Sequence, residues 1–125
     1  MKSFLTALII EPNDKLIVPY TYLDDSYSII RKSSAREGLT ALFTNRVDIV
    51  FISASFPPNK TLSILETIKN KSKTKLIPVV VVVDFTNRLN FIPGTTWGGK
   101  IGVLDSFANE AQFVVVTDRI FRLML

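Results

Sequence analysis

Hydrophobic positions along the chain follow two different periods in alternation. Continuous apolar runs rich in β-branched residues occur at residues 4–10, 48–54 and 78–83, a pattern typical of parallel strands covered on both faces. A mixed polar and apolar run at residues 27–32 suits an edge strand that is open to solvent on one side. A short apolar run at residues 101–104 is a fifth candidate. The pattern therefore predicts five strands.

Segments with helical spacing separate several of these strands. Apolar residues recur every three to four positions in residues 35–43 and 61–69, which predicts two amphipathic helices. Residues 13–23 show the same spacing, and we expect a helix there that Pro19 kinks or delays. Residues 84–100 contain one proline and three glycines, which predict a loop or a distorted helix.

The last segment, residues 106–125, predicts the longest helix, with Ser106 as its N-cap. It is more apolar than one helical face requires. One side of this helix would carry Ala111, Val114, Val115 and Asp118. Another side would carry Phe113, Val116, Ile120 and Met124. Both sets cannot face the same sheet, so one predicts a contact surface, unless residues 84–100 fold over it.

The order of these elements predicts the fold. Strands and helices alternate as βαβαβαβ, followed by an irregular crossover and a final βα pair. Right-handed crossovers convert this order into an α/β, doubly wound, flavodoxin-like parallel sheet of five strands with the order 2-1-3-4-5. The chain shows no internal repeat and no linker, so we expect residues 1–125 to form a single domain.

The composition of the chain excludes several classes of protein and of functional site. No apolar run approaches the roughly 20 residues of a membrane span, and the N-terminus reads as a strand rather than a signal peptide, so we expect a cytoplasmic protein away from the membrane. The chain has no cysteine and no histidine, which excludes disulfides, the usual zinc sites, cysteine nucleophiles and Ser-His relays. Most catalytic schemes end there, and we predict no catalytic residue, no metal site and no cofactor.

The net charge of +4 is concentrated in one turn. That turn contains Lys69, Lys71, Lys73 and Lys75. A lysine stripe of this kind either contacts phosphates or is a solvated loop, and the second interpretation is the more economical for a predicted turn. We therefore expect no nucleic-acid partner, although a nucleic-acid-binding adaptor that uses this loop stays as an alternative.

Three strand motifs resemble those of bacterial response regulator receiver domains. The apolar run that ends at Ile10 leads into Glu11 and Pro12, where that family has a pair of acidic residues. The run from Val47 to Ser53 resembles the third strand, which ends on the phosphoacceptor aspartate and is followed four residues later by proline, here Pro57. The run from Ile77 to Val83 resembles the fourth strand, which ends on threonine or serine.

The resemblance implies a degenerate phosphoacceptor pocket. A receiver uses an aspartate nucleophile, further carboxylates for Mg²⁺, a hydroxyl and a lysine, because phosphoryl transfer depends on positioning and charge neutralisation. Here the lysine position falls at Ser106, or at Asp105 if the register shifts by one residue. The pocket positions carried over are Glu11, Pro12, Ser53, Val83 and Ser106. Only Glu11 retains a functional group of the receiver set.

The resemblance therefore implies a pseudo-receiver, which is not an enzyme and which acts in signal transduction through protein contacts without phosphorylation. Its expected partner is another protein, a following output domain or a second copy bound through the final helix. We assign that interface to Phe113, Val116, Ile120 and Met124. A second interpretation is an atypical receiver regulated by a ligand or an unusual modification at the degenerate pocket.

Overall fold

Five parallel strands form one sheet in the order β2-β1-β3-β4-β5. The computed structural model describes residues 5–18, 22–23, 27–84 and 101–123. The strands are β1 (Leu5–Ile10), β2 (Tyr27–Lys32), β3 (Ile49–Ser53), β4 (Val79–Val83) and β5 (Ile101–Asp105). The predicted strand order is confirmed, and β2 lies at an edge as expected.

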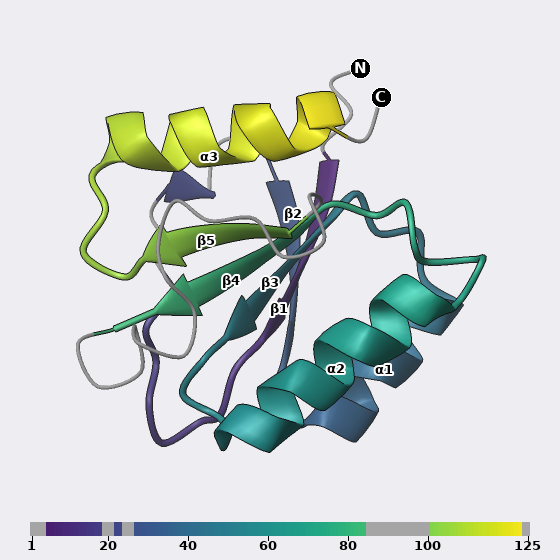
Figure 1. Ribbon diagram of the computed structural model, residues 1–125. Helices are drawn as coiled ribbons and strands as arrows, with labels where there is room; N and C mark the ends of the chain where they lie inside the picture. The colour runs from purple at the N-terminus through teal and green to yellow at the C-terminus, as the bar shows by residue number, and fades with distance from the viewer. Residues whose placement is uncertain (1–4, 19–21, 24–26, 85–100, 124–125) are drawn as a thin grey trace.

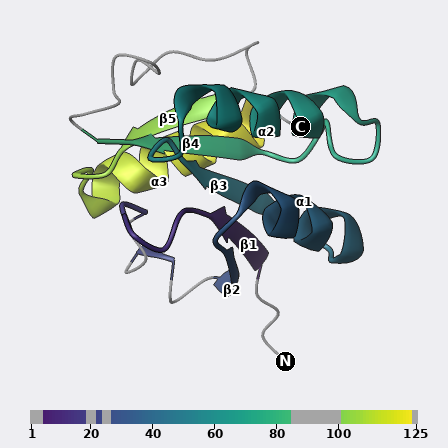
Figure 2. The ribbon, with the colours of Figure 1, turned by 90° about the horizontal axis from the view of Figure 1, so that it is seen from below.

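Helices cover both faces of this sheet (Figure 1). They are α1 (Ala35–Thr44), α2 (Pro58–Asn70) and α3 (Glu110–Leu123). The helices α1 and α2 lie on one face and α3 lies on the other, which is also visible from below in Figure 2. None of the helices in the described part of the chain has the length and apolar character to cross a membrane.

Successive side chains along each strand point to opposite faces of the sheet, and this divides the core into two clusters. In β4, Val79, Val81 and Val83 pack with residues of α1 and α2, whereas Val80 and Val82 pack with residues of α3. All five valines are fully buried. A continuous run of β-branched residues is therefore stable here because each face of the sheet has its own helical layer.

The helix predicted at residues 13–23 is wrong for residues 13–18, whereas residue 22 lies in a 3-10 turn. Residues 13–14 form a turn and residues 15–17 have no regular structure, while Pro19 and residues 20–21 lie outside the described chain. The carboxylate of Glu11 accepts hydrogen bonds from the backbone N–H groups of Ile17 and Val18 at 3.1 and 3.2 Å. A buried side chain thus satisfies donors that a helix would otherwise use, and the segment stays irregular.

The predicted N-cap of the last helix is also wrong. The backbone N–H of Ser106 donates to the carbonyl of Val83 at 2.8 Å, so Ser106 extends the pairing of β5 with β4. The cap is Asn109, because its side chain accepts from the N–H of Gln112 while the Gln112 side chain accepts from the N–H of Asn109, each at 2.9 Å. This reciprocal pair is a capping box, and it starts α3 at Glu110.

The helices predicted at residues 35–43 and 61–69 are confirmed, α2 starting three residues earlier at Pro58. Residues 85–100, which were expected to be irregular, lie outside the described chain.

Candidate functional site

The carboxyl ends of the strands bring the predicted pocket residues to one edge of the sheet. Glu11 follows β1, Ser53 ends β3, Val83 ends β4 and Ser106 follows β5. Ser53 lies beside Val82 in the β3–β4 ladder, and Val83 lies beside Asp105 in the β4–β5 ladder. Ligand sites of doubly wound sheets lie at this edge, so it is the first candidate site.

Ser53, at the predicted phosphoacceptor position, is fully buried. Its hydroxyl oxygen accepts a hydrogen bond from the backbone N–H of Ser55 at 3.1 Å and also bonds to the Ser55 hydroxyl. The carbonyl oxygen of Ser53 accepts from the hydroxyl of Thr61 at 3.5 Å. Ser53 therefore takes part in a local network that joins β3 to the start of α2, and its hydroxyl is withdrawn from solvent.

Glu11 has a structural role at the same edge. Its side chain is fully buried and lies 3.5 Å from Nε of Arg31 on β2, in addition to accepting from the amides of Ile17 and Val18. Removing a buried carboxylate from such partners is costly, because the guanidinium and the amide donors would stay behind without their acceptor. A divalent cation at Glu11 would have to compete with these donors.

The remaining predicted positions offer little to a phosphoryl group. The side chain of Val83 is fully buried in the cluster that α2 covers. Pro12 and Ser106 are half-buried. The carboxylate of Asp105 accepts from the backbone N–H of Phe107 at 2.9 Å, so this residue shapes the turn that leads to α3. Within the described ranges, no group of three acidic side chains is arranged to hold a metal ion.

Two charged residues that sequence reasoning missed meet at this edge. The ammonium of Lys15 lies 3.0 Å from a carboxylate oxygen of Asp84, which directly follows β4. The backbone carbonyl of Lys15 also accepts from the hydroxyl of Ser55 at 3.4 Å. The position of Asp84 after a buried strand was a usable signal, but the helix expected at residues 13–23 gave no reason to place Lys15 beside it.

The predicted partner surface on α3 needs correction. Phe113 and Ile120 are only 3% and 1% exposed, because the inner face of α3 packs on the sheet. The Phe113 ring stacks on Phe51 with centroids 5.7 Å apart and lies 5.5 Å from the ring of Tyr22. Val116 is half-buried against the same cluster, and Met124 lies outside the described residues. Assigning Phe113 and Ile120 to a partner surface was wrong.

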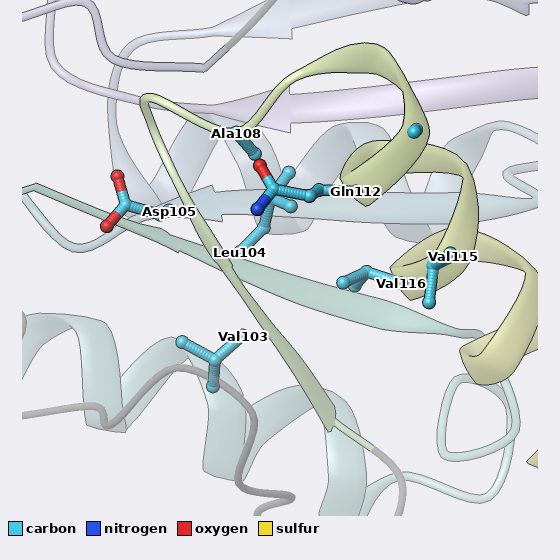
Figure 3. A pocket seen from close by; sticks show the side chains of 8 residues that line it. Val103, Leu104, Asp105, Ala108, Gln112, Val115 and Val116 are labelled. Carbon is cyan, nitrogen blue, oxygen red and sulfur yellow. The ribbon is translucent and has the colours of Figure 1, made fainter.

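The apolar surplus of α3 lies instead on its outer face. Val114 and Val115 are each 54% exposed, and Phe107 in the preceding turn is 70% exposed. A groove of about 360 Å³ runs between β5 and the first half of α3. Figure 3 shows Leu104 directed toward Ala108 and Gln112, with Val115 and Val116 further along the helix. The groove is lined by Val103, Leu104, Asp105, Ala108, Ala111, Gln112, Val115 and Val116.

Two lysines of the basic turn bond to the protein itself. The ammonium of Lys69 donates to the carbonyls of Lys75 and Ile77 at 3.3 and 2.8 Å. That of Lys73 donates to the carbonyl of Phe43 at 3.3 Å. The Lys69 bonds tie the end of α2 to the segment before β4, and the Lys73 bond ties the following turn to α1, so part of the predicted lysine stripe serves the fold.

Tyr27 lies at the opposite end of the sheet, where β2 begins. Burial raises the pKa of its phenol above the usual 10.0, and the negative charge of Asp48 raises this pKa further. The carboxylate of Asp48 also accepts a hydrogen bond from the backbone N–H of Thr6 at 2.7 Å. This end of the sheet therefore holds a phenol that resists ionisation.

Comparison with known proteins places the fold among receiver domains. A response regulator receiver domain protein from Clostridium thermocellum has 21% sequence identity and a TM-score of 0.72, covering 95% of this chain and 96% of that chain. The chemotaxis response regulator CheY4 of Vibrio cholerae has 18% identity and a TM-score of 0.71, covering 94% and 99%. A sensor protein from Polaromonas sp. JS666 has 15% identity and a TM-score of 0.74, covering 97% and 98%.

No protein-family model matches the sequence, and no curated protein does so either. At these identities the structural likeness establishes the fold: the chain has the five-stranded architecture of receiver domains.

Proposed function

We propose that this chain is a receiver-type signalling domain that works without phosphoryl transfer, through contacts with other proteins. One observation carries the proposal: the residue at the acceptor position, Ser53, is fully buried and hydrogen-bonded to Ser55. Phosphoryl transfer requires an accessible nucleophile in line with the donor, together with charges that neutralise the transferred group. A buried neutral hydroxyl meets neither requirement, so the domain is proposed to be a non-enzymatic module.

The surrounding residues support the same conclusion. Glu11, the one carboxylate in a matching position, is engaged with Arg31 and two backbone amides. Burial of Ser53 in this conformation also argues against an unusual modification of its hydroxyl. The alternative of nucleic-acid binding loses support from Lys69 and Lys73, because both donate to backbone carbonyls.

Incubation with acetyl phosphate and Mg²⁺, followed by intact mass measurement, tests the absence of phosphoryl transfer. We expect no added phosphate on the wild-type chain. The variant Ser53→Asp should also stay unmodified, because the second acidic residue, the hydroxyl and the lysine would still be missing. A stoichiometric adduct that hydroxylamine removes from the wild type would show an acylphosphate and would sink the proposal.

The outer face of α3 and the adjoining groove are the proposed contact surface. Val114 and Val115 are both half-exposed, and Val115 also lines the groove, so the two features form one apolar surface. Exposed apolar surfaces of this kind usually mark contacts with another protein. A following domain, a different protein or a second copy of this chain could each cover this surface.

Size-exclusion chromatography with light scattering tests the case of a second copy. If the wild type associates, Val115→Asp should weaken association while the urea midpoint of unfolding stays unchanged. Leu76→Asp is the matched control, because Leu76 is 58% exposed in the turn before β4 and lies outside the proposed surface. Equal association of both variants would exclude the outer face of α3 as the interface.

A further inference from the structure

The loop that follows β1, residues 12–18, is tied at both ends by buried or half-buried charges. At its start, the guanidinium of Arg31 donates to the side-chain oxygen of Asn13 at 3.0 Å. At its end, the carboxylate of Glu11 accepts from the amides of Ile17 and Val18. These contacts hold the loop to β1 and β2, and the chain drawn in purple in Figure 1 passes along the carboxyl edge of the sheet.

In the middle of this loop, Lys15 makes the contacts that reach the next two strands. Its backbone carbonyl accepts from the hydroxyl of Ser55, just after β3, and its ammonium pairs with Asp84, just after β4. Ser55 is in turn the hydrogen-bond partner of Ser53. One residue thus connects the β1 loop to the network that surrounds the buried hydroxyl.

The Lys15–Asp84 ion pair is more open to solvent than the contacts of Glu11. The side chain of Lys15 is 46% exposed, whereas that of Asp84 is 11% exposed. A half-exposed ion pair is weak and is screened by salt, so it can break while the buried contacts of Glu11 persist.

We propose that the Lys15–Asp84 ion pair is a latch that holds the β1 loop over Ser53 and closes the carboxyl edge of the sheet. The inference deepens the proposed function, on which it rests, by giving this edge a conformational switch that needs no phosphate. Breaking the ion pair lets the middle of the loop move away, and exposes Ser53 without unfolding the sheet.

A single engineered thiol reports this opening. The chain has no cysteine, so Ser53→Cys places one unique thiol at the buried position, with nearly the same shape. Its rate of reaction with an aromatic disulfide reagent measures how often position 53 reaches solvent. We expect slow labelling in this parent variant, and a rate that increases with NaCl concentration as the ion pair is screened.

Removing the ammonium should accelerate the labelling. In the Ser53→Cys background, Lys15→Met keeps the length of the side chain and deletes its charge. We expect labelling at least about threefold faster, the factor that corresponds to about 0.7 kcal/mol for a partly exposed pair. The salt dependence should disappear in this variant. Lys71→Met, which removes an exposed lysine far along the chain, should label like the parent.

The latch is refuted by equal labelling rates in the parent, Lys15→Met and Lys71→Met proteins, or by fast labelling in the parent itself. If Ser53→Cys fails to fold, amide hydrogen exchange replaces the labelling assay and is measured on proteins that keep the native Ser53. Lys15→Met should then speed exchange at Ser55 and leave the strand amides unchanged; no change at Ser55 also refutes the latch. An acylphosphate on the wild type would overturn the proposed function, whereas only these rates decide the latch.

Discussion

Replacing Phe113 by alanine tests which face of α3 belongs to the core. Phe113 is 3% exposed, and its ring lies between those of Phe51 on β3 and Tyr22. Truncation removes the aromatic contacts and leaves a cavity between helix and sheet, because neither the strand nor the helix can collapse fully into the space. The variant should therefore have a lower free energy of unfolding, and its self-association should not change.

The expected loss is about 3–5 kcal/mol, the usual cost of a buried Phe→Ala change. A domain of this length is stable by roughly 6–19 kcal/mol, from about 0.05–0.15 kcal/mol per residue. The variant should therefore stay folded at 25 °C unless the wild type lies near the lower limit, with a large part of its stability gone.

Urea denaturation followed by far-UV circular dichroism measures this loss. With a slope m near 2 kcal/mol per molar urea, the midpoint should fall by about 2 M, and m itself should not change. Val114→Ala is the matched control, because Val114 is 54% exposed on the same helix. Its stability should stay within about 0.5 kcal/mol of the wild type.

A loss below about 1 kcal/mol for Phe113→Ala would refute the assignment of this side chain to the core. Weaker self-association at unchanged stability would refute it as well, and would restore Phe113 to a partner surface. Ile120, which is 1% exposed on the same inner face, provides an independent check through Ile120→Ala.

Three further changes test other parts of the structure. Glu11→Ala should lower the free energy of unfolding by about 3 kcal/mol in urea titrations, because buried donors lose their acceptor, and Glu11→Gln should cost less. Burial and Asp48 raise the pKa of Tyr27, so the phenol loses its proton at lower pH in the unfolded chain than in the folded one. The free energy of unfolding should therefore be level below pH 10.0 and fall above it. Tyr27→Phe should reduce that fall. Asn109→Ala should lower stability by about 1 kcal/mol by removing the acceptor for Gln112, whereas Asn109→Ser should retain most of it.

The sheet and its order could be predicted from the sequence because the determining signals are local. A run of five valines at residues 79–83 suits a strand between two helical layers, and the mixed run at residues 27–32 suits an edge. Once strands and helices alternate, the handedness of the crossovers leaves few possible orders. The motifs that end the strands at Glu11, Ser53 and Val83 also indicated where the candidate site lies.

The contents of that site depended on contacts between distant residues. The helical spacing of residues 13–23 is real, but the Glu11 carboxylate and Arg31 of β2 hold residues 13–18 in an irregular loop. Periodicity cannot predict a side chain that takes over backbone hydrogen bonds. The Lys15–Asp84 ion pair joins residues 69 positions apart, and it forms only because β1 and β4 end at the same edge of the sheet.

The final helix shows most clearly which features the sequence determines and which the tertiary structure decides. Its sequence determines that it carries more apolar residues than one face needs, and therefore that some apolar surface stays outside the core. Two sets of residues satisfied that requirement equally well, since both contain several apolar side chains at helical spacing. The tertiary structure decided between them, because the capping box at Asn109 and the ring of Phe51 turn Phe113 toward the sheet and leave Val114 and Val115 in solvent.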